Sequence, residues 1–246
     1  MGNQKALIED ILRLEWKSFQ NVKNIGARAA CQNDFSTFCI MRSSQAQSWS
    51  EETLESYRRD LIEAENAGRN LLSEKYGHMM ESTSPAEYAK IAHLLPVIAS
   101  DAITLIEQIV TIIMQWEVEL QKKHPYILAQ GRPLFSKEDA LGVTSLETYL
   151  RGELKSFSIR TLKHYLAHVR KLRQENTNGS EIVMRATVKQ YGFHSLQEAN
   201  DKIKASRSLQ GSSMTANHPL RVCRQAAGWR RTEPPNAWIN CSARFM

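Results

Sequence analysis

The chain has 246 residues and 42% hydrophobic content, which allows one large or two small domains with a sizeable core. Its formal charge of +6 is concentrated at one end, because residues 207–246 hold six Arg, no Lys and a single acid. The remaining chain holds 26 basic and 25 acidic residues, so its nearly neutral surface lacks the electrostatic footprint of nucleic-acid binding.

The first two predicted elements are amphipathic helices joined by a loop. Residues 4–22 repeat apolar side chains at helical spacing, and Glu15 falls in the middle of the apolar face. A loop is predicted at 23–34. The second helix is predicted at 34–49, with Asp34 suited to the N-cap. Its apolar side, marked by Phe35, Phe38 and Trp49, also carries two polar residues, Arg42 and Gln45.

A long helix is predicted next, from Ser50 to about Met80, because the apolar residues keep one phase throughout. Glu65 lies in the centre of this apolar stripe, and Arg69 lies at its margin. A short helix at 86–95 follows, since proline is favoured at the first turn of a helix.

The segment 98–122 is apolar on nearly all sides and predicts the central helix of the fold. Its apolar run is too short, and too often interrupted by Glu and Gln, to span a bilayer. Such a helix must be covered by other helices, so we predict an all-α bundle without a membrane segment. Its one polar stripe consists of Thr104, Glu107, Gln108, Thr111 and Gln115.

Residues 123–144 show no convincing periodicity, and connections of this length are often lids or binding loops. Four further helices are then predicted, at 145–157, 159–176, 180–191 and 195–206. On the first of these four helices, Glu153 lies between leucines of the inner line. The bundle therefore has about eight or nine helices.

The last forty residues, 207–246, change in character, because they combine Arg without Lys, a Pro-Pro pair and scattered Trp. We predict a helical domain at 1–206 and a basic, disordered tail at 207–246. The other interpretation of the tail is an arm that binds nucleic acid or a protein partner. The N-terminus lacks the long apolar segment of a secretory signal, so we expect a cytoplasmic protein.

Three carboxylates fall in the middle of predicted buried stripes on different helices: Glu15, Glu65 and Glu153. Each needs a cation, a metal, hydrogen bonds or a proton, because burial of an unpaired charge is too costly. The predicted partners are Arg42 and Arg69. One interpretation is a buried network that fixes helix register. The other is a pocket in which the arginines bind an anion and a glutamate of raised pKa acts as general base.

A dinuclear metal site is a third interpretation, since helical bundles hold such sites with carboxylates from several helices. That design needs Glu-x-x-His pairs, and none of the three glutamates is followed by His at this spacing. The four cysteines form no C-x-x-C pair, and no phosphate-binding or dinucleotide motif is present. We predict no metal site, and the sequence identifies no cofactor.

Several strings, in the same order along the chain, resemble a bacterial family catalogued as a domain of unknown function, DUF4125. The resemblance spans about residues 5–204 and implies no established activity, so it assigns no catalytic residue. The strings that carry it are Glu15-Trp16, Arg28–Gln32, Phe38–Gln45, Gly68–Leu72, Glu74–Tyr76, Met79–Thr83 and Glu147–Leu154.

The leading functional hypothesis is an enzyme or binding protein for a small anionic metabolite. The candidate catalytic residues are Glu15, Glu65 and Glu153. The candidate ligand-binding residues are Arg42, Gln45 and Arg69, with Arg28 and Arg132 contributed by the two loops. The alternative is a structural or regulatory interaction module without catalytic activity, in which the buried charges are only ion pairs and an exposed apolar patch receives a partner.

Overall fold

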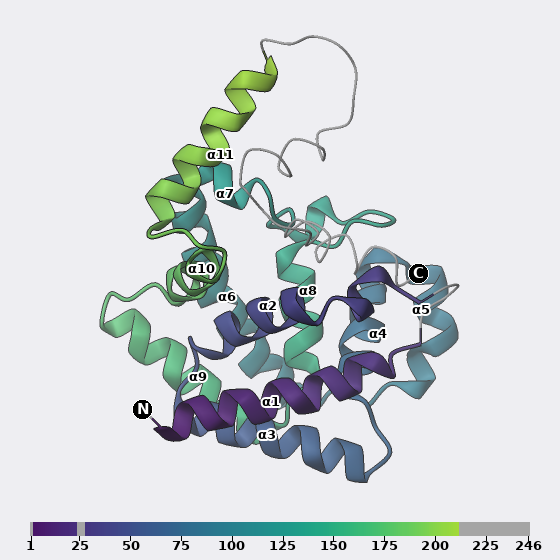
Figure 1. The fold of residues 1–246 in the computed structure, drawn as a ribbon. Coiled ribbons are helices and arrows are strands. Elements are labelled where there is room, and N and C mark those ends of the chain that lie inside the picture. Colours follow the sequence, from purple (N-terminus) through teal and green to yellow (C-terminus); the bar gives the residue numbers. More distant parts are fainter. Residues whose placement is uncertain (1, 24–27, 212–246) are drawn as a thin grey trace.

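The computed structural model describes residues 2–23 and 28–211, and within these residues it contains eleven α-helices and no strand (Figure 1). The predicted all-α bundle is confirmed. The helices are α1 (Gly2–Gln20), α2 (Phe35–Ala46), α3 (Glu51–Asn66), α4 (Leu71–Thr83), α5 (Pro85–Ile91), α6 (Ser100–Lys123), α7 (Pro125–Leu128), α8 (Leu146–Lys155), α9 (Ile159–Gln174), α10 (Gly179–Gln190) and α11 (Leu196–Gly211).

Helix α6 is the longest of these helices and runs through the middle of the bundle, in contact with α8, α9 and α10 (Figure 1). Its apolar side chains fill the largest hydrophobic cluster, where Ile109 is completely buried. The predicted polar stripe faces outward, and its residues Thr104, Glu107, Thr111 and Gln115 are exposed. The central position predicted for this segment is therefore confirmed.

Helix α1 lies across α3 and also contacts α2 and α4, so the N-terminal helices form one side of the bundle (Figure 1). Helix α4 then packs closely along α8, which links this side to α6. The close approach requires Gly152, because a Cβ at this position would lie 2.6 Å from Cγ of Met79 and 2.9 Å from the carbonyl oxygen of Lys75. This contact places α8 beside both halves of the bundle.

Serine and aspartate side chains cap several of the helices, and Asp34 does so at the predicted position. Asp34 accepts a hydrogen bond from the backbone N–H of Thr37, and Ser145 accepts one from that of Thr148. Such caps satisfy N–H groups that have no partner inside the helix. Further caps of the same kind are provided by Ser50, Ser158 and Ser195.

The single long helix predicted at 50–80 is wrong, because the chain breaks it into α3 and α4. Gly68 adopts a φ of 70°, a left-handed conformation that glycine takes at little cost. The N–H of Arg69 closes the turn on the carbonyl of Ala64 at 2.8 Å, and Asn70 caps α4. The glycine is thus needed for the turn, and the two helices point in different directions.

The connection at 123–144 contains little regular structure, as predicted, but it is held in place. The carboxylate of Asp139 accepts hydrogen bonds from the backbone N–H of Ser145, at 2.6 Å, and from the hydroxyls of Ser82 and Thr148. These bonds attach the connection to α4 and α8. Leu141, in the same connection, is 81% exposed.

Helix α11 continues to Gly211, past the domain boundary predicted at 206. The rest of the predicted tail lies outside the described residues, and the division of the chain into two domains stays a prediction. Among the described residues, no helix is long and apolar enough to cross a bilayer.

Candidate functional site

Arg42 on α2 lies at the centre of a buried charge network formed with α1 and α8. Its Nε donates to Oε2 of Glu15 at 2.9 Å, and its Nη2 donates to Oε1 of the same carboxylate. Its Nη1 donates to Oε1 of Glu153 at 2.7 Å and to Oε1 of Gln45 at 2.6 Å. Glu15 is 1% exposed and Glu153 is 3% exposed, so two of the three carboxylates predicted to be buried meet Arg42, one of the two arginines predicted as their partners.

Other side chains donate further hydrogen bonds to both carboxylates. The Tyr57 hydroxyl donates to Glu15 at 2.7 Å, while the Gln45 amide donates to Oε2 of Glu153 at 2.8 Å. Nζ of Lys75 lies 3.2 Å from Oε1 of Glu153. Two carboxylates thus face two cations, and four of the five N–H donors of Arg42 are engaged.

Electrostatics in the network favours the ionised forms. Burial raises the pKa of Glu153, but the charges of Arg42 and Lys75, with hydrogen bonds from Gln45 and Arg42, outweigh burial and bring the pKa to about 2. Burial lowers the pKa of Arg42, whereas Glu15 and Glu153 raise it, and the net pKa lies well above the usual value. Glu153 therefore stays ionised at neutral pH, which contradicts the idea that this glutamate acts as a general base of raised pKa.

The network continues through an aromatic ring toward the connection at 123–144. Nζ of Lys75 lies 3.7 Å from the ring centroid of Tyr149, and Cζ of Arg132 lies 4.6 Å from the same centroid. Arg132 also donates from Nη1 to the carbonyl of Thr144 at 2.9 Å, and burial lowers its pKa. Arg132 is therefore brought to the outer end of the network, as expected for a residue of the covering loop.

Glu65 and Arg69 do not belong to this network. The prediction that Glu65 is buried is wrong. Its side chain is 45% exposed and forms an ion pair with Lys17. Arg69 is half-exposed and holds Glu74 through two hydrogen bonds, of 2.8 and 2.7 Å. The physical reason is the turn at Gly68, since Glu65 lies at the end of α3 and Arg69 beyond it.

Arg28 is exposed and also lies apart from the network. Its Nε donates to the side chain of Asn33 at 3.0 Å, and its Nη2 donates to the carbonyl of Gln32 at 2.9 Å. A further bond reaches the side chain of Gln20 at the end of α1. Arg28 therefore ties the loop at 28–33 to α1, and the rest of the loop at 24–27 lies outside the described residues.

The sequence interpretation missed several buried charges, among them Lys75 and Asp60. Asp60 accepts a hydrogen bond from the Thr161 hydroxyl at 2.6 Å and another from the backbone N–H of Ser158 at 3.0 Å. Both residues lie on the inner faces of their helices, Asp60 beside Tyr57 and Lys75 between Leu71 and Met79. Helical phase was thus a usable signal for both. Among the described residues, no three His, Cys, Asp or Glu side chains form a metal-binding cluster.

The low pKa of Glu153 predicts a loss of stability in acid. Because its folded pKa, about 2, is below the usual 4.5, its contribution is complete above about pH 4.5 and disappears as the pH falls toward 2. This contribution amounts to about 3 kcal/mol at most. Between about pH 5 and pH 3, the free energy of unfolding of Glu153→Gln should therefore fall less steeply than that of the wild type. Glu65→Gln, which changes an exposed carboxylate, is the control and should keep the wild-type slope.

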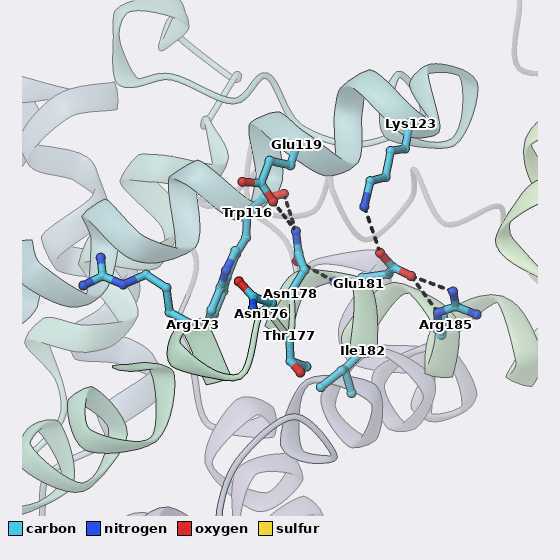
Figure 2. Close-up of a pocket in the computed structure, with 10 residues that line it drawn as sticks. All are labelled: Trp116, Glu119, Lys123, Arg173, Asn176, Thr177, Asn178, Glu181, Ile182 and Arg185. Carbon is cyan, nitrogen blue, oxygen red and sulfur yellow. Dashed lines mark hydrogen bonds and ion pairs between the residues drawn. The ribbon is translucent and has the colours of Figure 1, made fainter. Parts of the chain in front are cut away.

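A separate depression, with a volume of about 450 Å³, lies where α9 turns into α10 against the C-terminal half of α6. Its size is within the usual range for small-molecule sites. Figure 2 shows its side chains, with Arg173 on one side of the Trp116 indole and Lys123, Glu181 and Arg185 on the other. The other residues that line it are Glu119, Asn176, Thr177, Asn178 and Ile182.

The backbone of this depression is fixed by the turn at 175–178. Asn176 adopts a φ of 52°, and the N–H of Thr177 returns to the carbonyl of Leu172 at 2.8 Å. Asn178 caps α10 through the N–H of Glu181, and its Nδ2 donates to the carbonyl of Trp116 at 3.0 Å. The walls are therefore positioned by α6 and by the start of α10.

The charged groups of the depression fall into two kinds. Glu181 holds Arg185 through hydrogen bonds of 2.9 and 2.6 Å and lies 3.6 Å from Nζ of Lys123, so these three charges are satisfied together. The guanidinium of Arg173, by contrast, has no hydrogen bond or ion pair with any residue that the structure describes. The sequence predicted the turn at 177–179, but it gave no signal that Trp116 and Lys123 would meet it.

The fold and the network define a helical bundle whose apolar core encloses a buried network of paired charges. Comparison with family models identifies residues 5–201 as a match to "Protein of unknown function (DUF4125)". The chain therefore belongs to the DUF4125 family, as the resemblance indicated. No curated protein and no solved structure matches it.

Proposed function

We propose that this chain is a binding protein for a small anionic molecule and that the molecule binds in the depression between α6 and α10. The observation that carries the proposal is the guanidinium of Arg173, exposed at a depression of about 450 Å³ and without a carboxylate partner among the described residues. A guanidinium binds carboxylate and phosphate groups through two parallel hydrogen bonds.

One observation favours this place over the buried network, and a second favours binding over catalysis. Arg42 already donates to two carboxylates and to Gln45, so an anion would have to displace a buried carboxylate and leave it unpaired. The lining of the depression includes amides, cations and carboxylates but neither His nor Cys. This composition favours binding over general acid–base or nucleophilic catalysis.

Ligand-induced stabilisation tests the proposal. Inorganic phosphate, acetate and hexanoate, each at about 20 mM, are added to the full chain and the melting temperature is recorded. We expect at least one of these anions to raise the melting temperature by about 3–5 °C, as a millimolar ligand does for a protein of this size. Arg173→Gln should reduce the rise to about a third, as expected for a tenfold loss of affinity.

The matched control is Arg170→Gln, which removes a cation from the same helix without touching the depression. Nη2 of Arg170 donates to Gln108 at 2.5 Å, and Arg170 does not line the site. This variant should keep the full rise in melting temperature. An equal loss in both variants would mean that the anions act on the surface charge of α9, and no rise in the wild type would reject the proposal.

The second candidate function is a structural or regulatory interaction module. Exposed apolar side chains favour it, because Leu94 is 72% exposed, Val97 is 97% exposed and Leu141 is 81% exposed. For either function we propose a cytoplasmic location, which cell fractionation tests. Absence of any ligand response would make the interaction module the preferred function.

A further inference from the structure

We infer that the molecule bound in the depression carries a positive charge as well as the anionic group, with an apolar segment between them. Its chemical class is then an ω-amino carboxylate or a short peptide in its zwitterionic form. This inference rests on the proposed function, because it assumes that Arg173 receives the anionic group.

We infer that the positive charge of the bound molecule lies beside the carboxylate of Glu119 on α6. This carboxylate is exposed at the depression, where it accepts a long hydrogen bond, of 3.3 Å, from Nδ2 of Asn178. It forms no ion pair with any residue in the described part of the chain. Lys123, one helical turn further along α6, is directed to Glu181 and not to Glu119 (Figure 2).

The apolar segment of the bound molecule would pass the part of the depression that lies between Arg173 and Glu119. Figure 2 shows the Trp116 indole between Arg173 on one side and the Asn178 and Glu119 side chains on the other. The ring is fixed from behind, because a Cβ on Gly179 would lie only 2.7 Å from its Cζ3 atom. Trp116 is only 6% exposed, so an apolar segment that passes the ring buries little further apolar surface, and the two charged ends of the molecule supply most of the recognition.

A zwitterion matches this arrangement better than a simple anion. A monoanion with an apolar tail would cover part of the Glu119 carboxylate and give it nothing in return, which costs free energy. An ammonium group at the other end of the ligand removes this cost and adds an attraction between opposite charges. The site is open to solvent, so the added attraction should be modest, about fivefold in affinity.

Three probes of equal chain length separate the contributions: hexanoate, 6-aminohexanoate and hexylamine. Their dissociation constants for the full chain are measured by isothermal titration calorimetry. We expect 6-aminohexanoate to bind about fivefold more tightly than hexanoate, and hexylamine to bind more weakly than either. Arg173→Gln should weaken both carboxylates about tenfold.

The decisive variant is Glu119→Gln, which removes the negative charge but keeps the shape of the side chain. It should remove the advantage of 6-aminohexanoate over hexanoate and leave hexanoate binding unchanged or improved. The matched control, Glu175→Gln, changes an exposed carboxylate at the end of α9 that does not line the depression, and it should keep the fivefold advantage.

The outcomes separate this inference from the proposed function. If hexanoate binds in an Arg173-dependent way but 6-aminohexanoate binds no better, the inference fails and the proposed function stands. An advantage of 6-aminohexanoate that persists in Glu119→Gln also overturns the inference. If none of the probes binds to the wild type, both fail.

Discussion

Replacement of Arg42 by Met is expected to lower the free energy of unfolding by about 3–5 kcal/mol, the usual cost of removing one partner from a buried ion pair. Methionine fills much of the same volume but carries no charge. The two buried carboxylates, Glu15 and Glu153, are then left with one cation, Lys75, instead of two. Urea denaturation of both proteins, followed by circular dichroism at neutral pH, measures the difference.

The matched control is Arg58→Met, which removes an arginine from a partly exposed ion pair with Asp10. A pair of this kind contributes at most about 1 kcal/mol, because solvent screens the charges. We therefore expect a small effect from Arg58→Met and a large one from Arg42→Met. Equal effects would show that the buried network contributes no more to stability than a surface pair.

Substitution of Gly152 by Ala is expected to cost about 2–3 kcal/mol, because the helices α4 and α8 must separate to admit the methyl group. A Cβ at this position would lie 2.9 Å from the carbonyl oxygen of Lys75, which is backbone and cannot rotate away. Separation of the helices would also disturb the contact between Lys75 and Glu153. Thermal and urea unfolding measure the loss.

Gly77→Ala is the matched control for this prediction, since it places the same methyl group on α4 at a different contact. There a Cβ would lie 2.8 Å from Cδ2 of Leu95, the end of a flexible side chain. The gain in helix propensity, about 1 kcal/mol, should offset the contact, so we expect little net change. If both alanine variants lose the same free energy, the close packing of α4 on α8 is not the cause.

Much of the fold could be predicted from helical phase and capping residues. The polar stripe of 98–122 placed α6 correctly, because a helix with one exposed stripe must bury its other sides. The break between α3 and α4 was missed for a physical reason: the apolar phase continues across Gly68, and its left-handed φ, set by the turn, is not visible in the pattern.

The same reasoning explains which site residues were found. Glu15, Arg42 and Glu153 lie in the middle of long helical stripes, where phase determines burial, and these residues meet. Glu65 shares the phase of its stripe but lies at the end of its helix, where the core no longer covers it. The depression was invisible in the sequence, because residues near 116–123 and 173–185 meet only through the packing of α10 on α6.

The central claim is that the buried network supports the fold whereas the depression binds the anion. The most direct test compares the hexanoate affinity of Gln45→Leu, which weakens the network at Arg42 and Glu153, with that of Arg173→Gln. We expect Gln45→Leu to lose stability but keep the wild-type affinity, and Arg173→Gln to lose affinity about tenfold. Loss of affinity in Gln45→Leu together with unchanged affinity in Arg173→Gln would instead place the anion in the network.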